Sequence, residues 1–201
     1  MPSIYDIKPK FQKLLTPVLE FLYRSGITAN QITISALVLS IIIGVSFWYA
    51  SYNQLLFLAL PIGLFLRMAL NALDGMMART YNQQSKLGEI LNELGDIISD
   101  TVIYFPLLVY ESEHIYLVVA FLCLTILNEC AGILGKVISG ERRYDGPMGK
   151  SDRAFLIGIY GLLSFFSVPL SKLSFWIFIV LNLLLVMSTI NRVKKTLKHA
   201  G

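Results

Sequence analysis

The stretch NALDGMMARTYNQQSKLGEILNELGDIISD, residues 71–100, sets acidic and amide side chains at helical spacing in a strongly apolar chain. A helix advances about 100° per residue, so oxygen-bearing side chains three or four positions apart share one face. Five of them fall within an arc of roughly 100°: Glu89, Asn92, Glu93, Asp96 and Asp100. Hard divalent cations prefer such oxygen ligands. The stretch therefore predicts a metal site on one helix face.

A second polar stripe lies just before it. Arg67, Asn71 and Asp74 follow the same helical spacing. Two facing helices that each carry such a stripe converge on one point, so we expect the metal site to lie between helices.

The composition indicates that the solvent is a lipid bilayer. Hydrophobic residues make up 55% of the 201 residues and charged residues only 15%, and the mean hydropathy is +0.65. A carboxylate at membrane depth is costly, so one that is present is a functional-site hypothesis by default. We expect an integral membrane protein with a polar site inside it.

Six apolar stretches approach the roughly 20 residues that a spanning helix needs. They run from Thr33 to Tyr52, Leu55 to Leu73, Leu87 to Tyr110, Ile115 to Val137, Arg153 to Pro169 and Phe175 to Asn191. The expected fold is all-α, a polytopic membrane bundle of six transmembrane helices. We expect one domain over residues 1–201, with an interfacial segment at 1–31, the bundle at 32–191 and a basic tail at 192–201.

Basic residues gather on one side of the predicted bundle. The connections at 51–54 and 111–114 contain no Lys or Arg, and the third connection on that side contains only Lys172. The positive-inside rule then predicts that both termini face the cytoplasm, in the cell (inner) membrane.

The first thirty residues have an amphipathic pattern. Apolar residues such as Phe11 and Leu15 lie on one side and Lys8, Lys10 and Lys13 on another. This pattern favours a helix lying in the membrane interface. The alternative is a solvated lead-in to the first span.

The stretch that opens this section also carries a spaced motif. The chain resembles the CDP-alcohol phosphatidyltransferase family, which is marked by the pattern D-x2-D-G-x2-A-R-x8-G-x3-D-x3-D. Six positions match it in order and spacing: Asp74, Gly75, Ala78, Arg79, Gly88 and Asp96. The first and third aspartates are replaced by Asn71 and Asn92.

The resemblance implies a reaction and a set of roles. In that family the four acids bind two divalent ions, Mg²⁺ or Mn²⁺, which hold the pyrophosphate of a CDP-linked donor, and CMP leaves. Carried over by position, Asp74 is a metal ligand and Asp96 is a metal ligand or the catalytic base. Gly75 and Ala78 leave room for the nucleotide, Arg79 pairs with a donor phosphate, and Gly88 belongs to the same substrate-binding motif.

The two asparagines remove two negative charges from this site. Asn71 and Asn92 retain a carbonyl oxygen that can bind a metal, and Glu93 and Asp100 lie close enough on the helix to complete a ligand set. Our hypothesis is a modified site in which Asp74 and Asp96 bind at least one ion with these neighbours. The alternative is that the extra acids line a hydrated cavity or pair with Arg79 and Lys86.

A basic loop follows the fourth span. The sequence GERRYDGPMGKSDRAF, residues 140–155, has the Gly and Pro residues of a turn-rich loop. We expect Arg142, Arg143, Lys150 and Arg153 to include contacts with donor or acceptor phosphate. The alternative is ordinary positive-inside charge attracted to anionic lipid.

Glu129, within the fourth span, is also unusual in lipid. It is expected to face the polar cavity or to pair with Lys136 or Arg67 in the bundle.

Two functions of different classes fit these features. The first is a membrane transferase of phospholipid biosynthesis that moves a phosphatidyl or related phosphoalcohol group to an alcohol acceptor, possibly phosphorylated. The second is a non-catalytic relative that binds a CDP-lipid or a metal; a transporter is a weaker third. The net charge of +4 is explained by membrane orientation, so nucleic-acid binding is not expected. The resemblance implies a homodimer, and the small residues Ala131 and Gly135 would permit close helix packing.

Overall fold

The computed structural model describes residues 4–199, and it describes the side chains of 10–170 and 173–199. All regular structure in this part of the chain is helical. The order is α1 (Ile4–Arg24), α2 (Ala29–Trp48), η1 (Gln54–Leu58), α3 (Ala59–Thr80), α4 (Lys86–Tyr104), α5 (Leu107–Tyr110), η2 (Ser112–His114), α6 (Ile115–Ser139), α7 (Lys150–Phe165) and α8 (Ser171–His199). The predicted all-α fold is confirmed.

Four helical stretches are long and apolar enough to cross a membrane. They are Ala29–Trp48, Gln54–Thr80, Ser112–Ser139 and Leu173–His199. The other two long helices of the expected bundle differ for physical reasons: α7 has only 16 residues, and α4 carries Lys86 and four acids. These two helices bring charge into the bundle, as do α3, α6 and α8 with the buried Arg67, Glu129 and Arg192.

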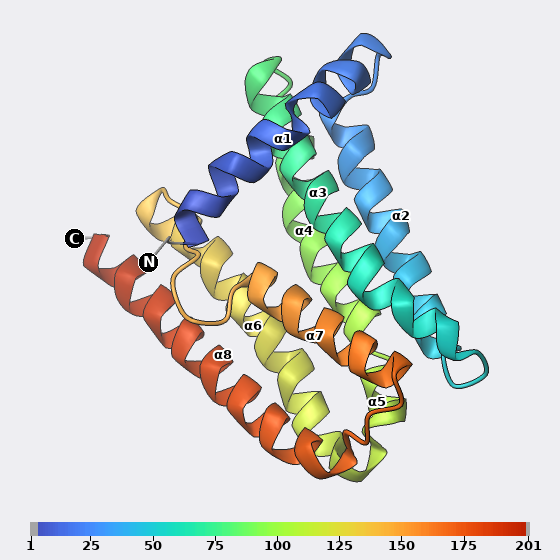
Figure 1. Ribbon diagram of the computed structural model, residues 1–201. Coiled ribbons are helices and arrows are strands. Elements are labelled where there is room, and N and C mark those ends of the chain that lie inside the picture. Colours follow the sequence, from blue (N-terminus) through green and yellow to red (C-terminus); the bar gives the residue numbers. More distant parts are fainter. Residues whose placement is uncertain (1–3, 200–201) are drawn as a thin grey trace.

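The long helices form one bundle. Helix α2 packs against α3 and α4, α6 packs against α8 and α4, and α7 packs against α3. Figure 1 shows α1 crossing α3 at a steep angle, with both chain ends on the same side of the view. Helix α1 is fastened by a small apolar cluster made of Leu19, Ala29, Ile32, Leu73 and Met77.

Capping interactions set the starts of the helices that carry the motif. Thr28 Oγ1 accepts a hydrogen bond from Gln31 N (3.3 Å), and Gln31 Oε1 accepts one from Thr28 N (2.9 Å), a reciprocal capping box before α2. Ser85 Oγ accepts a hydrogen bond from Gly88 N (3.0 Å) and caps α4. Gln83 Oε1 accepts a hydrogen bond from Ala29 N (2.8 Å) and ties the α3–α4 turn to α2.

The connections predicted to share the base-poor side do meet at one end of the bundle. Gln54 Nε2 donates to Phe165 O (2.7 Å), and Ser51 N donates to Tyr110 Oη (2.8 Å). The small residues Ala131 and Gly135 are buried within the chain, where a Cβ on Gly135 would lie 2.6 Å from Arg143 Cγ. These two small residues therefore allow close packing within one chain and are not exposed to a second copy.

Large apolar side chains cover much of the outer surface. Phe65, Leu134 and Leu183 are among those more than half exposed. Contiguous apolar surface of this kind is rare on a soluble monomer and is what lipid covers. The apolar core lies inside, around Phe47, Leu60 and Phe121.

Packing of α2 on α4 depends on a glycine. A Cβ at Gly44 would lie 2.6 Å from Val102 O, a backbone atom that cannot move aside alone. We predict that Gly44→Ala lowers the free energy of unfolding by about 1–3 kcal/mol through overpacking. Gly95→Ala is the matched control, because a Cβ there meets nothing within 4 Å and helix propensity alone favours Ala by up to about 1 kcal/mol. Thermal unfolding in one detergent, followed by circular dichroism, measures both; a Gly44→Ala protein as stable as Gly95→Ala would contradict this packing.

Candidate functional site

Five of the eight motif residues line one cavity, and Asn71, Arg79 and Asp96 lie outside its lining. The cavity volume is about 350 Å³, within the range of small-molecule sites. It lies between the start of α2, the end of α3, the following turn and the start of α4. Its lining comprises Ala29, Asn30, Thr33, Asp74, Gly75, Ala78, Gln83, Gln84, Ser85, Gly88, Glu89, Asn92 and Lys136. Residues predicted from a linear motif thus converge in space.

Asp74 is the buried acid of this cavity. It lies on α3, and Asp74 Oδ2 accepts a hydrogen bond from Thr33 Oγ1 (3.0 Å) on α2. Thr33 was not predicted, because no local sequence signal distinguishes it from the other hydroxyl residues of α2. Its hydroxyl orients the Asp74 carboxylate toward the cavity wall.

The two asparagines of the motif lie on the facing helices. Asn92, on α4, is half-buried and lines the cavity. Asn71 precedes Asp74 by three residues on α3, and its Nδ2 atom is buried with no hydrogen-bond partner among the described residues. An unpaired buried amide donor costs about 1–3 kcal/mol unless a ligand or water receives it.

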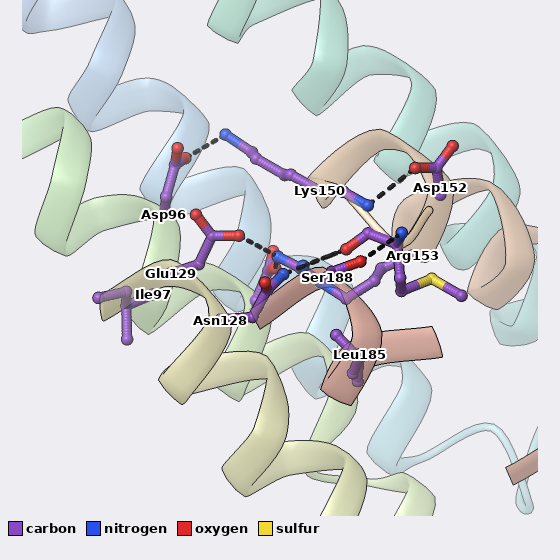
Figure 2. A network of polar contacts seen from close by, with 12 residues as sticks. Asp96, Ile97, Asn128, Glu129, Lys150, Asp152, Arg153, Leu185 and Ser188 are labelled. Carbon is purple, nitrogen blue, oxygen red and sulfur yellow. Dashed lines mark hydrogen bonds and ion pairs between the residues drawn. The ribbon is translucent and has the colours of Figure 1, made fainter. Parts of the chain in front are cut away.

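The Asp96 carboxylate forms an ion pair with a lysine. Lys150 Nζ, at the first turn of α7, forms an ion pair with Asp96 Oδ1, and Figure 2 shows the lysine side chain extended toward it. Arg67 Nη2 lies 3.6 Å from Asp96 Oδ1 on the other side. Asp96 and Lys150 are both close enough to Asp74 to act on it electrostatically.

Asp100, one turn after Asp96, is buried between two arginines. Asp100 Oδ1 lies 2.7 Å from Arg67 Nη1, and Asp100 Oδ2 lies 2.7 Å from Arg153 Nη2. All three side chains are at most 2% exposed. This pairing joins α3, α4 and α7.

Glu129 extends the same network into α6 and α8. Glu129 Oε1 lies 2.8 Å from Arg153 Nη2 and 3.6 Å from Arg192 Nη1, while Glu129 Oε2 lies 2.8 Å from Arg142 Nη2. Figure 2 shows Glu129 and Arg153 pointing toward each other beside Asn128. Glu129 therefore does pair within the bundle, but with arginines other than the partners expected for it.

Glu93 also has an arginine partner. Arg142 Nε lies 2.6 Å from Glu93 Oε1 and 2.8 Å from Glu93 Oε2. Burial alone would lower the pKa of Arg142, but its hydrogen bonds to Glu93 and Glu129 outweigh burial and raise that pKa above its ordinary value. The guanidinium is thus permanently charged. Glu89 pairs with Lys136 at the cavity rim.

The residues predicted to contact phosphate separate into two groups. Arg142 and Arg153 are engaged by carboxylates, whereas Lys150 reaches Asp96 at the site itself. Arg143 is buried, and its Nη2 donates to Ser139 Oγ (3.3 Å). Arg79 is exposed, with no ion pair to any described residue, and a Cβ on Gly75 would lie 3.3 Å from its Nη1.

Sequence reasoning missed Arg192 and the rim lysine Lys136. Lys136 was expected only as an alternative partner of Glu129, and Arg192 was assigned to the basic tail. Arg192 directly follows an apolar stretch, and an arginine at membrane depth needs an anionic partner. This signal could have identified it. Among residues 4–199, no group of three or more His, Cys, Asp or Glu side chains is arranged to hold a metal ion.

Two relatives in curated sequences resemble the chain. It is 46% identical over 195 residues to the inner membrane protein YnbA of Escherichia coli (strain K12), with 97% of this chain and 96% of the relative covered. It is 35% identical over 100 residues to the archaetidylinositol phosphate synthase of Pyrococcus horikoshii, which covers 49% of this chain and 50% of that relative. This likeness and the apolar helices together establish a membrane protein.

Solved structures of a Mycobacterium tuberculosis enzyme share the fold. Its phosphatidylinositol phosphate synthase with CDP-DAG bound matches with a TM-score of 0.76 at 20% identity, covering 94% of this chain and 96% of that one. The same enzyme in complex with manganese and citrate matches with a TM-score of 0.75 at 20% identity, covering 92% and 90%. At this identity the likeness establishes the fold alone.

A family model settles the ancestry that the motif had indicated. The model described as CDP-alcohol phosphatidyltransferase matches residues 26–190. This match takes in all helices from α2 to most of α8, together with the cavity and the ion pairs around it. The chain belongs to the CDP-alcohol phosphatidyltransferase family.

Proposed function

We propose that this protein is a membrane transferase that moves a phosphatidyl or related phosphoalcohol group from a CDP-linked donor to an alcohol acceptor and releases CMP. The observation that carries the proposal is the cavity in which Asp74, Gly75, Ala78 and Gly88 meet. The CDP-DAG bound to the mycobacterial enzyme and the synthase activity named for the Pyrococcus relative support it.

The cavity suits the nucleotide end of the donor. Its wall is formed by small residues, Gly75, Ala78 and Gly88, so a ligand can approach the helix backbone closely. A Cβ on Gly88 would lie 2.6 Å from Asn30 Oδ1 and would close this space. The exposed Arg79 beside Gly75 is placed to pair with a donor phosphate.

The residues present fit one divalent ion, Mg²⁺ or Mn²⁺. Asp74 and Asp96 offer carboxylate oxygens and Asn71 and Asn92 offer amide oxygens, all hard ligands. When bound, such an ion neutralises charge that develops on phosphate oxygens during transfer. Glu93 and Asp100 were predicted as further ligands; their arginine contacts favour a structural role, and their part in metal binding stays a prediction.

The chain's own residues account for the remaining steps. The acceptor hydroxyl oxygen forms a bond to the donor phosphorus, the bond from that phosphorus to the CMP oxygen breaks, and CMP leaves with the electron pair. The hydroxyl proton passes to the Asp96 carboxylate, which we assign as the base. Asp96 serves only after the Lys150 ammonium has moved off it.

A phosphorylated acceptor fits the basic side of the site. Arg143, Arg153 and Arg192 each keep a buried Nε atom with no hydrogen-bond partner among the described residues. Together with Lys150, they leave donor capacity that an added phosphate would use.

The architecture proposed for the membrane is six spans, which add α4 and α7 to the four apolar helical stretches. The base-poor end formed by Ser51, Tyr110 and Phe165 supports placing both termini in the cytoplasm. The exposed apolar Leu14 and Phe21 of α1 support an interfacial helix. One domain over 1–201 completes the proposal, together with the homodimer that the family resemblance implies, for which the contact surface is one other than Ala131 and Gly135.

A second candidate is a non-catalytic CDP-lipid or metal-binding relative. Asn71 and Asn92 favour it, because they leave the cavity motif intact while removing half of its acids.

Acceptor-dependent CMP release tests the proposed reaction. Purified protein in nanodiscs with CDP-diacylglycerol, Mn²⁺ and a panel of plain and phosphorylated alcohols should release CMP with one acceptor. We predict that Asp96→Asn slows this release at least about 100-fold, the range of general-base catalysis. Asp145→Asn is the matched control, because Asp145 pairs with Lys195 away from the cavity. Measurable CDP-lipid binding with no CMP release from any acceptor would favour the second candidate.

The variants Asp100→Asn and Glu93→Gln test whether these two acids are structural or bind the metal ion. We predict that Asp100→Asn loses about 3–5 kcal/mol of stability, because two buried arginines are left with an uncompensated charge. Its Mn²⁺ affinity, and that of Glu93→Gln, should stay within about threefold of the parent. Thermal unfolding and Mn²⁺ titration measure these effects. A stable Asp100→Asn protein with lost Mn²⁺ binding would make Asp100 a ligand.

A further inference from the structure

The charged side chains of the network that joins α3, α4, α6, α7 and α8 balance without any bound ion. Five cationic side chains pair with or act on five carboxylates across α3, α4, α6, α7, α8 and the basic loop. The cations are Arg67, Arg142, Arg153, Arg192 and Lys150, and the carboxylates are Asp74, Glu93, Asp96, Asp100 and Glu129. The family's acids at positions 71 and 92 would add two uncompensated negative charges to this region.

The charges of the site residues do not match those of two divalent ions. Two divalent ions bring four positive charges and the donor's pyrophosphate brings two negative ones, so their entry would leave the balanced network with two positive charges in excess. The other nearby acids are already paired with cations: Glu89 with Lys136, Glu93 with Arg142, and Asp100 with Arg67 and Arg153. Uncompensated charge is costly where side chains are shielded from water. The residues of this chain therefore do not fit two divalent ions.

Lys150 lies where a second cation is needed. Its ammonium contacts Asp96, lies in the field of Asp74, and remains 25% exposed, so it can move. A lysine is a compact charge on a flexible stem, which suits a group that must follow phosphate oxygens. We propose that Lys150 supplies the positive charge of the missing second ion, and that the site takes up one divalent ion together with the CDP-linked donor.

The unpartnered amide of Asn71 supports this assignment independently. Its buried Nδ2 is a donor, and a donor faces an anion and not a cation. The Asn71 amide can therefore donate its N–H to a phosphate oxygen, while its Oδ1 remains available to the single ion. The donor's pyrophosphate brings two negative charges and the single ion brings two positive ones, so their joint entry keeps the interior neutral.

Counting bound Mn²⁺ tests the inference without measuring turnover. The probe is Mn²⁺ with and without CDP, followed by electron paramagnetic resonance and calorimetry on the full chain in nanodiscs. We expect one Mn²⁺ per chain with CDP present and weaker binding without it. Lys150→Met should bind Mn²⁺ at least about tenfold more tightly in the absence of CDP, since a positive charge is removed from Asp96. Lys86→Met is the matched control, because Lys86 is exposed and forms no ion pair with any described residue; its affinity should not change.

The double variant Asn71→Asp with Asn92→Asp keeps the test decisive if Lys150→Met does not fold. It should bind two Mn²⁺ ions with CDP, and one without it. Two ions, or none, in the parent chain with CDP would overturn the inference, as would a Lys150→Met protein whose Mn²⁺ affinity falls or stays unchanged. If Lys150 is purely structural, the Mn²⁺ affinity of Lys150→Met falls or stays unchanged.

The inference rests on the proposed function, and the outcomes separate the two. Two bound ions together with acceptor-dependent CMP release would refute the role of Lys150 and retain the transferase. One bound ion with the predicted Lys150→Met tightening, but no CMP release from any acceptor, would retain the cation role in a binding protein.

Discussion

The carboxylate of Asp100 between Arg67 and Arg153 is the interaction on which the rest of the bundle depends. These three side chains are almost fully buried, and removing any one leaves a charge that neither water nor lipid can stabilise. Because the three come from α4, α3 and α7, their pairing fixes the mutual position of those helices. Glu129 pairs with Arg153 and so fixes the position of α6, and its contact with Arg192 does the same for α8. Charge pairing thus sets a geometry that apolar contacts in lipid cannot specify, since lipid tails are as apolar as the helices.

The register of this network also positions the chemistry. Asp96 and Asp100 lie four residues apart on α4, and Lys150 and Arg153 lie three apart on α7, so each helix presents its pair on one face. Once Arg153 is anchored on Asp100, Lys150 is carried to Asp96. Asp100 and Arg153 are at most 1% exposed, whereas Asp96 and Lys150 are 14% and 25% exposed and can be reached by a ligand. One helix contact therefore serves both stability and function.

The sequence predicted most of the fold and half of the site. Apolar stretches and the spaced motif predicted the helices and the convergence of Asp74, Gly75, Ala78 and Gly88, because helical periodicity is local. It did not predict which arginine each acid selects. Glu93, Asp100 and Glu129 all lie within reach of more than one cation, and the choice among Arg67, Arg142, Arg153 and Arg192 depends on helix packing across the bundle, which no local pattern encodes.

The position of Arg142 shows why the basic loop was only partly understood from sequence. Its guanidinium lies between Glu93 and Glu129, so it closes α4 against α6, whereas Lys150, eight residues later, faces the cavity side. A guanidinium fork suits two carboxylates at once, and an ammonium suits a single exchangeable contact. The residue types in this segment therefore differ in their contacts: Arg142 and Arg153 join helices through carboxylates, and Lys150 makes a single ion pair among the described residues, with Asp96, which the proposed function has it exchange for a phosphate.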